Sequence, residues 1–132
     1  MQEYKKEMIQ KAQENIEEAK PFLQLGNKTS YIKALGYLHL AVGYYHKAGD
    51  KKNEKSVLAT VEKVRKAKSI IAAKEYIEEA RRDAKNAPVY LKKAEWHYSE
   101  AGKPELYEKA VRSLEKKPAT AGTRKKLESS FA

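Results

Sequence analysis

Apolar residues recur at helical spacing along almost the whole chain. In the first stretch, intervals of three or four residues place the apolar positions on one face of a helix. These positions are Ile9, Ala12, Ile16 and Ala19. Pro21 has no backbone N–H to donate, so we expect it to end this helix. We then expect a loop at 26–30 and a second helix from 31 to about 48.

The second predicted helix has the widest apolar face and is therefore expected to be central. Gly49 follows it at the place where a left-handed residue commonly ends a helix, and Asp50 can cap the next one. A third helix follows. At 66–69 the chain either breaks, with Ser69 as the new cap, or continues as one helix, and the sequence leaves both alternatives open.

Three further apolar stripes predict the remaining helices, over 70–84, 88–101 and 104–114. The last two each begin at a proline, which is favoured in the first turn of a helix. We therefore predict an all-α fold of five or six antiparallel helices, arranged as a helical bundle or a short α-solenoid.

Two segments of the chain recur. Residues 9–20 are repeated as 70–81 at an offset of 61, and residues 37–49 are repeated as 90–102 at an offset of 53. One shorter connection in the second copy explains both offsets. The sequence therefore predicts a tandem repeat of a three-helix unit.

The predicted helical-repeat domain covers 1–117, with its two copies at 1–66 and 69–117. Residues 118–132 lack apolar periodicity and are expected to form a flexible basic C-terminal tail. The net charge of +10 and the scarcity of large aliphatic residues approach the composition of disordered chains. Nine tyrosines and many alanines still allow a thin helical core.

Two helical families share local patterns with this chain. Ala-x-x-x-Tyr-x-x-Ala-Gly followed by a second helix resembles the tetratricopeptide hairpin, at 41–61 and again at 94–114. The stretch 34–85 resembles the three-helix microtubule-interacting-and-trafficking domain, with Tyr-Ile-Glu-Glu-Ala-Arg at 76–81 in the place of that family's third-helix pattern. Both resemblances imply a role in binding peptides or proteins.

Residues suited to catalysis or metal binding are few. The chain has no cysteine, which excludes disulfides, thiol catalysis and cysteine-ligated zinc. His39 and His46 lie seven residues apart, about 10.5 Å along a helix, which is too far for one ion, and His97 has no histidine at ligand spacing. We expect no enzyme activity, no metal site and no cofactor. No apolar run could span a bilayer, so we expect a cytoplasmic protein without a membrane partner.

Two mid-helix glycines mark one candidate partner-binding surface. Gly36 and Gly43 each cost about 1 kcal/mol relative to alanine, which indicates close approach of another backbone or of a ligand. The surface also includes Tyr37, Leu40 and Tyr44. The alternative is tight packing of the glycines against a neighbouring helix of the same chain.

Trp96 is a second candidate, because it lies on the polar side of its predicted helix, where an aromatic side chain is often a binding anchor. It could equally pack under lysine side chains. A third surface is basic and could neutralise phosphates. Its candidates are Lys52, Lys55, Lys63, Lys66, Arg81, Arg82, Lys85, Arg124, Lys125 and Lys126. A solvated lysine face is the alternative for these residues.

The sequence favours a non-catalytic protein-interaction module, an adaptor or scaffold that binds a protein or peptide. The alternative is sequence-independent nucleic-acid binding through the basic surface. No aromatic side chain is interleaved with its lysines as a base-stacking platform would require. The oligomeric state is not defined by the sequence.

Overall fold

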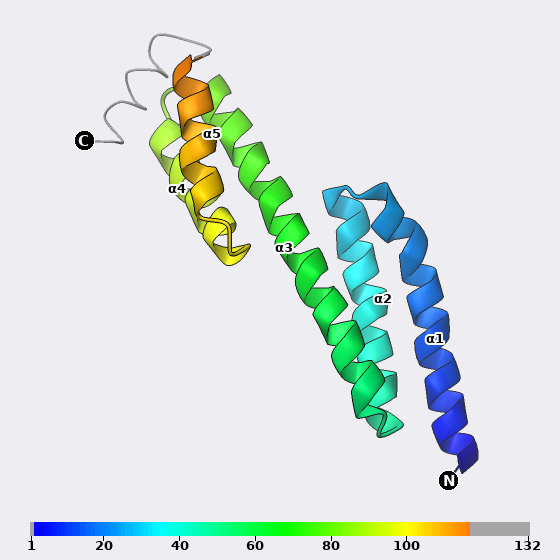
Figure 1. Cartoon of the computed structure of the whole chain (residues 1–132). Helices are drawn as coiled ribbons and strands as arrows, with labels where there is room; N and C mark the ends of the chain where they lie inside the picture. Colours follow the sequence, from blue (N-terminus) through cyan, green and yellow to red (C-terminus); the bar gives the residue numbers. More distant parts are fainter. Residues whose placement is uncertain (1, 117–132) are drawn as a thin grey trace. The chain divides into compact units, whose positions relative to one another are not determined.

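The computed structural model describes residues 2–116, and these form five α-helices (Figure 1). The helices are α1 (Gln2–Leu25), α2 (Lys28–Lys47), α3 (Lys51–Arg82), α4 (Ala87–Glu100) and α5 (Glu105–Lys116). No strand occurs within 2–116, so the predicted all-α class is confirmed. The predicted tail at 118–132 lies outside the described residues.

The chain divides into two compact units, Met1–Lys68 and Ser69–Ala132, with the boundary inside α3. α3 is one continuous helix of 32 residues, which answers the question that the sequence left open at 66–69. Neither glycine nor proline interrupts 51–82, and most of its residues are good helix formers. Ser69 therefore continues the helix instead of capping a new one.

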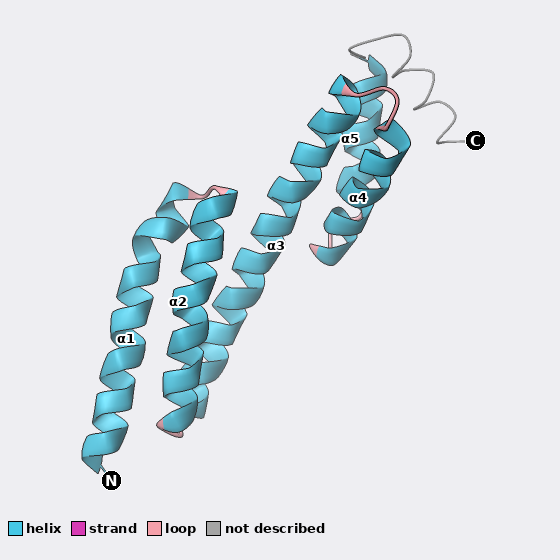
Figure 2. Cartoon of the chain, turned by 180° about the vertical axis from the view of Figure 1, so that it is seen from behind, coloured by secondary structure: helices cyan, strands magenta, loops and turns pink. Residues whose placement is uncertain are grey.

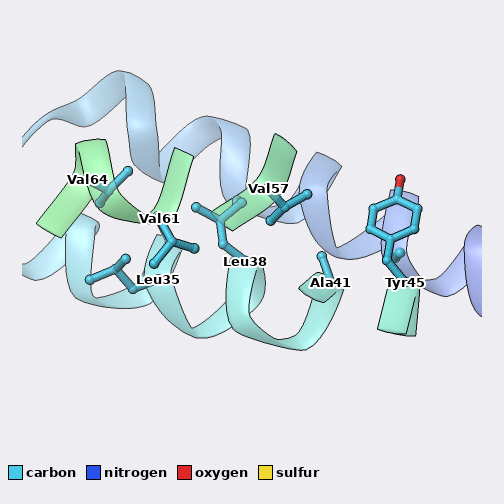
Figure 3. Packing of buried hydrophobic residues seen from close by; sticks show 10 residues of the cluster. Leu35, Leu38, Ala41, Tyr45, Val57, Val61 and Val64 are labelled. Atoms are coloured by element: carbon cyan, nitrogen blue, oxygen red, sulfur yellow. The ribbon is translucent and has the colours of Figure 1, made fainter. Parts of the chain in front are cut away.

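In unit 1, α1 lies beside α2, and the N-terminal half of α3 lies along α2 (Figures 1 and 2). Leu38 of α2 lies between Val57 and Val61 of α3 (Figure 3). Where α1 and α2 carry alanine in the core, the side chains are fully buried, so the helices can approach closely. The buried cluster consists of Ala12, Ala19, Ala34, Leu35, Leu38, Ala41, Tyr45, Val57, Val61 and Val64.

The expectation that Pro21 ends the first helix is wrong, because α1 continues to Leu25. Proline removes one hydrogen bond, the one to the carbonyl of Glu17, and commonly bends a helix. Figure 2 shows α1 bending near its C-terminal end. Phe22 and Leu23, beyond the proline, pack against the core of unit 1. This packing keeps the last turn helical despite the missing donor.

The start of α2 also differs from the expectation. α2 begins at Lys28, within the predicted loop, and Asn27 is its N-cap; the side-chain oxygen of Asn27 accepts a hydrogen bond of 2.8 Å from the backbone N–H of Ser30. Asparagine is among the best N-cap residues because its side chain satisfies a backbone donor that has no partner inside the helix.

α2 and α4 end in the same way. Gly49 and Gly102, with φ of 71° and 72°, adopt the left-handed conformation that the sequence predicted for Gly49. Asp50 N–H donates to the carbonyl of Tyr45, and Lys103 N–H donates to that of Tyr98. These are Schellman motifs, in which glycine supplies a backbone conformation that other residues rarely adopt.

In unit 2, α4 and α5 lie along the C-terminal half of α3 (Figures 1 and 2). The core again combines alanines with a few large side chains, and Leu91 and Val111 are among the most deeply buried. The buried cluster consists of Ala73, Ile77, Ala80, Ala87, Leu91, Ala94, Tyr98, Val111 and Leu114. Each unit thus has its own hydrophobic cluster.

Candidate functional site

A groove with a volume of about 480 Å³ lies in unit 2 between the C-terminal half of α3 and α5, and α4 contributes Tyr98 to it. Most of its lining is apolar. The apolar residues are Ile70, Ile77, Tyr98, Leu106, Ala110 and Leu114. The polar residues are Lys74, Glu78, Arg81, Lys109 and Ser113.

Helical periodicity explains why these side chains line one groove. On α3 the lining residues between Ile70 and Arg81 are spaced by three or four positions, so they share one face of the helix. On α5 the lining residues between Leu106 and Leu114 do the same. Ile70 and Arg81 are eleven positions apart, so the α3 wall is about 16 Å long, or roughly three helical turns.

The bottom of the groove is continuous with the core of unit 2. Ile77, Tyr98 and Leu114 are buried, whereas Leu106 and Ala110 are half-buried. Burial also raises the pKa of the Tyr98 hydroxyl above its ordinary value of 10.0. The apolar lining of the groove is in contact with water only through its open side.

The rim of the groove is positively charged. Glu78 forms an ion pair with Arg81 on the same wall, so these two charges compensate each other. Lys74 on α3 and Lys109 on α5 are exposed, and neither forms a salt bridge with any described residue. Two cations, one on each wall, therefore have no compensating carboxylate among residues 2–116.

The two glycines predicted as a partner surface lie on the exposed side of α2. A Cβ atom built on Gly36 or on Gly43 would meet nothing within 4 Å among the described residues. Packing against a neighbouring helix of the chain therefore does not explain them, which corrects that alternative. Leu40, between them, is 53% exposed, as is Ile32 one turn before Gly36.

The tyrosines grouped with these glycines point elsewhere. Tyr37 stacks on Phe22 of α1, with ring centroids 6.0 Å apart. Tyr44 is half-buried, and the ammonium group of Lys11 lies 5.8 Å from its ring centroid in a cation–π contact. Both rings pack against the core of unit 1. The five predicted residues thus divide between an exposed strip and the α1–α2 contact.

Trp96 is 57% exposed, so it is not covered by lysine side chains. Its ring meets His97 edge-on, with centroids 4.9 Å apart. His97 in turn stacks on Tyr76, with centroids 5.6 Å apart. This chain of aromatic contacts connects the indole to Tyr76 of α3 through His97, while more than half of the Trp96 surface stays exposed.

Four of the predicted basic residues lie together on the N-terminal half of α3. They are Lys52, Lys55, Lys63 and Lys66, all of which are exposed. At 100° per residue they fall within about 80° around the helix axis, over a length of about 21 Å. None of the four forms a salt bridge within the described part of the chain.

The other basic candidates belong to unit 2 or lie outside the described residues. Arg81 lines the groove, and Arg82 forms an ion pair of 3.8 Å with Glu79. Lys85 is exposed, just beyond the end of α3. The remaining candidates, Arg124, Lys125 and Lys126, lie outside the described residues.

Sequence reasoning missed the groove. Ile70, Ile77, Ala110 and Leu114 belong to the apolar stripes that predict the helices over 70–84 and 104–114, and no binding role was predicted for Leu106, Lys74 or Lys109. One signal was present. Leu106 widens the apolar stripe of α5 beyond the width that a single core contact needs, and the small Ala110 lies beside it.

Neither metal chemistry nor a membrane span is indicated in residues 2–116. No group of three or more histidine, aspartate or glutamate side chains there could hold a metal ion. No helix in the same range is long and apolar enough to cross a membrane. Comparisons with family models, with curated proteins and with solved structures find no match to this chain.

Proposed function

We propose that this protein is a non-catalytic interaction module whose unit 2 groove binds a helical segment of another protein. The observation that carries the proposal is the groove between α3 and α5, with its apolar lining and charged rim. An amphipathic helix that lays its apolar face into a hydrophobic groove is a common mode of peptide recognition.

The dimensions of the groove favour such a partner. Its α3 wall spans about three helical turns, which matches a helical segment of roughly eleven residues. Both walls are helices, so their side chains form ridges and grooves into which those of a third helix can fit. The half-buried Leu106 and Ala110 would become buried on binding, and the burial of apolar surface drives such association.

In this proposal the helices run antiparallel to their neighbours and form two copies of a three-helix unit. The Schellman motifs at Gly49 and Gly102, at the predicted offset of 53, support this arrangement. So does burial at the offset of 61, where Ala12 and Ala73 are both fully buried. Two similar units would provide an adaptor with a scaffold for more than one contact.

A peptide-display selection tests the proposal. The library carries helical peptides of fourteen residues with a fixed leucine stripe and variable flanking positions, and the full chain is the bait. A Ser113→Trp variant places a large ring at the exposed rim of the groove. Ser99→Trp is the matched control, because Ser99 is also an exposed helical serine of unit 2 and does not line the groove.

We expect binders that lose at least tenfold in affinity for Ser113→Trp and retain their affinity for Ser99→Trp. Circular dichroism and melting curves of both variants check that each remains folded. A selection without binders, or binders that are indifferent to Ser113→Trp, would contradict the proposed groove.

Nucleic-acid binding is the second candidate function, and the lysine cluster on the N-terminal half of α3 favours it. Its four side chains are exposed along one side of the helix and form no salt bridge within residues 2–116. Binding to duplex DNA should then fall with salt at a log–log slope of about −0.9 per phosphate contacted. Replacing all four lysines by alanine should reduce this slope. An unchanged slope would exclude the cluster as the contact surface.

A further inference from the structure

We infer that the segment bound in the unit 2 groove is an acidic amphipathic helix, with carboxylates on both sides of its apolar stripe near mid-length. The inference rests on the proposed function and adds the chemistry of the partner. It follows from where the uncompensated cations of the groove lie relative to its apolar lining.

The two uncompensated cations belong to opposite walls. Lys74 stands on α3 and Lys109 on α5, and both are exposed and outside any salt bridge with a described residue. A helix lying between the walls would have one lysine on each side. Carboxylates on one side of its apolar stripe would meet only one of them, so both sides must be acidic.

The positions of the two lysines define where along the partner the carboxylates belong. Lys74 lies four residues after Ile70 and seven before Arg81, and Lys109 lies between Leu106 and Ser113. Both lysines are thus near the middle of their walls. At one end of the α3 wall Arg81 is already paired with Glu78, which removes the need for a partner carboxylate there.

An apolar stripe is needed as much as the charges. Ile77 and Leu114 lie at the bottom of the groove beneath the cationic rim. A polyanion without apolar side chains would neutralise the lysines but leave this surface in contact with water. The lysine stems can lie along the partner's apolar edge while their ammonium groups reach its carboxylates. An acidic amphipathic helix satisfies both requirements.

Three matched peptides test this chemistry by fluorescence anisotropy with the full chain. All have the leucine stripe of the display library and a helix-favouring background. The first has two glutamates on each side of the middle turn, the second has glutamines at the same places, and the third has the four glutamates moved to the two ends. Helical content is measured for each, so that differences in affinity do not arise from folding of the peptide.

We expect the first peptide to bind about tenfold more tightly than the second, because each exposed charge pair contributes roughly a threefold gain. The third should lie between them. The double variant Lys74→Glu/Lys109→Glu should remove the preference for glutamate, and a peptide with lysines at the same places should then bind it better than the glutamate peptide does. Lys92→Glu/Lys103→Glu makes the same charge change at exposed positions of unit 2 that do not line the groove, and should preserve the preference.

The outcomes separate this inference from the proposed function. If the glutamine peptide binds as tightly as the glutamate peptide, and both lose affinity for Ser113→Trp, the groove binds helices but the inferred acidity is wrong. If the off-groove charge reversal abolishes the preference as well, the net charge of the chain explains the effect and the inference is again wrong. If neither these peptides nor the selected ones depend on the groove, both proposals fail.

Discussion

At the predicted repeat offset of 53, buried positions of the two units are similar in residue type and exposure, whereas surface positions differ. At an offset of 53, Leu38 and Leu91 are 2% and 1% exposed, and Tyr45 and Tyr98 are 4% and 2% exposed. The same offset relates the two Schellman glycines. Positions that decide helix packing and helix ends thus behave alike in both units, although each unit has its own cluster.

The walls around these buried positions carry different residues. Val57 of α3 is buried against the core of unit 1, whereas Ala110, at the corresponding place in α5, is half-buried and lines the groove. Ser56 of unit 1 corresponds to Lys109 of unit 2. A smaller side chain at Ala110 and a longer, charged one at Lys109 can therefore form a charged groove while α3 and α5 remain helical.

Truncating a leucine in either buried core should cost more stability than any other single substitution considered. Leu38→Ala and Leu91→Ala each remove a fully buried side chain, and each should lower the free energy of unfolding by about 2–5 kcal/mol. Urea denaturation of both variants measures the two losses. If one substitution were nearly neutral, the two positions would not have the same role, and the correspondence at an offset of 53 would be broken.

Exchanging the side chains at positions 57 and 110 should change the free energy of unfolding less than the two leucine substitutions do. Val57→Ala removes two buried methyl groups and should cost about 1.5 kcal/mol. Ala110→Val adds them beside the groove and should change stability by less than about 0.5 kcal/mol, because the new atoms extend into open space. It should nevertheless weaken binding of the selected peptides. Unchanged peptide affinity would show that Ala110 does not set the depth of the groove.

The exposed side of α2 differs from its counterpart in α4. Gly36 and Gly43 correspond to Val89 and Trp96, both of which are exposed. Since a Cβ atom at either glycine would meet no neighbour within 4 Å among residues 2–116, Gly36→Ala and Gly43→Ala should each raise the free energy of unfolding by about 1 kcal/mol. Gly49→Ala is the contrasting control and should destabilise the protein, because its φ of 71° is strained for alanine. Loss of stability in the first two variants would mean that these glycines have a packing role.

Sequence periodicity predicted much of the fold because helices bury one stripe of residues at a fixed spacing. The stripes at 9–19 and 31–48 correspond to α1 and α2, and Gly49 has the conformation that was expected. Pro21 was misjudged because local propensity says nothing about Phe22, whose packing holds the last turn of α1. Long-range contacts of this kind are absent from a sequence pattern.

The groove was not predicted from the sequence, for a related reason. Ile77 and Leu106 both look like core residues in a helical pattern, but a groove depends on which two helices leave a space between them. Lys74 and Lys109 are relevant to binding only because α3 and α5 form the two walls of one groove. An apolar stripe with lysines beside it can be recognised in the sequence. That the two lysines lie on opposite walls of one groove can be seen only in the structure.

Tyr45 and Tyr98, which lie 53 positions apart, should make a small contribution to the pH dependence of stability in alkaline solution. Burial raises the pKa of Tyr45 and of Tyr98 above the ordinary value of 10.0, and at Tyr45 the negative charge of Asp50 adds to the effect. A tyrosine with a raised pKa in the folded state stabilises the fold fully below its unfolded pKa, and this contribution is lost as the pH rises through the folded pKa. Tyr45→Phe and Tyr98→Phe should therefore each flatten the decrease in stability above pH 10.

Asp50→Asn distinguishes the causes of the raised pKa at the two tyrosines, because asparagine is also a good N-cap residue but has no charge. We expect this substitution to lower the pKa of Tyr45 toward its ordinary value and to leave that of Tyr98 unchanged, since burial alone raises the latter. A pH titration of isotope-labelled tyrosine rings by NMR resolves the two groups. Equal shifts at both rings would show that the charge acts on the whole chain, and the absence of any shift at Tyr45 would assign its raised pKa to burial, as in unit 2.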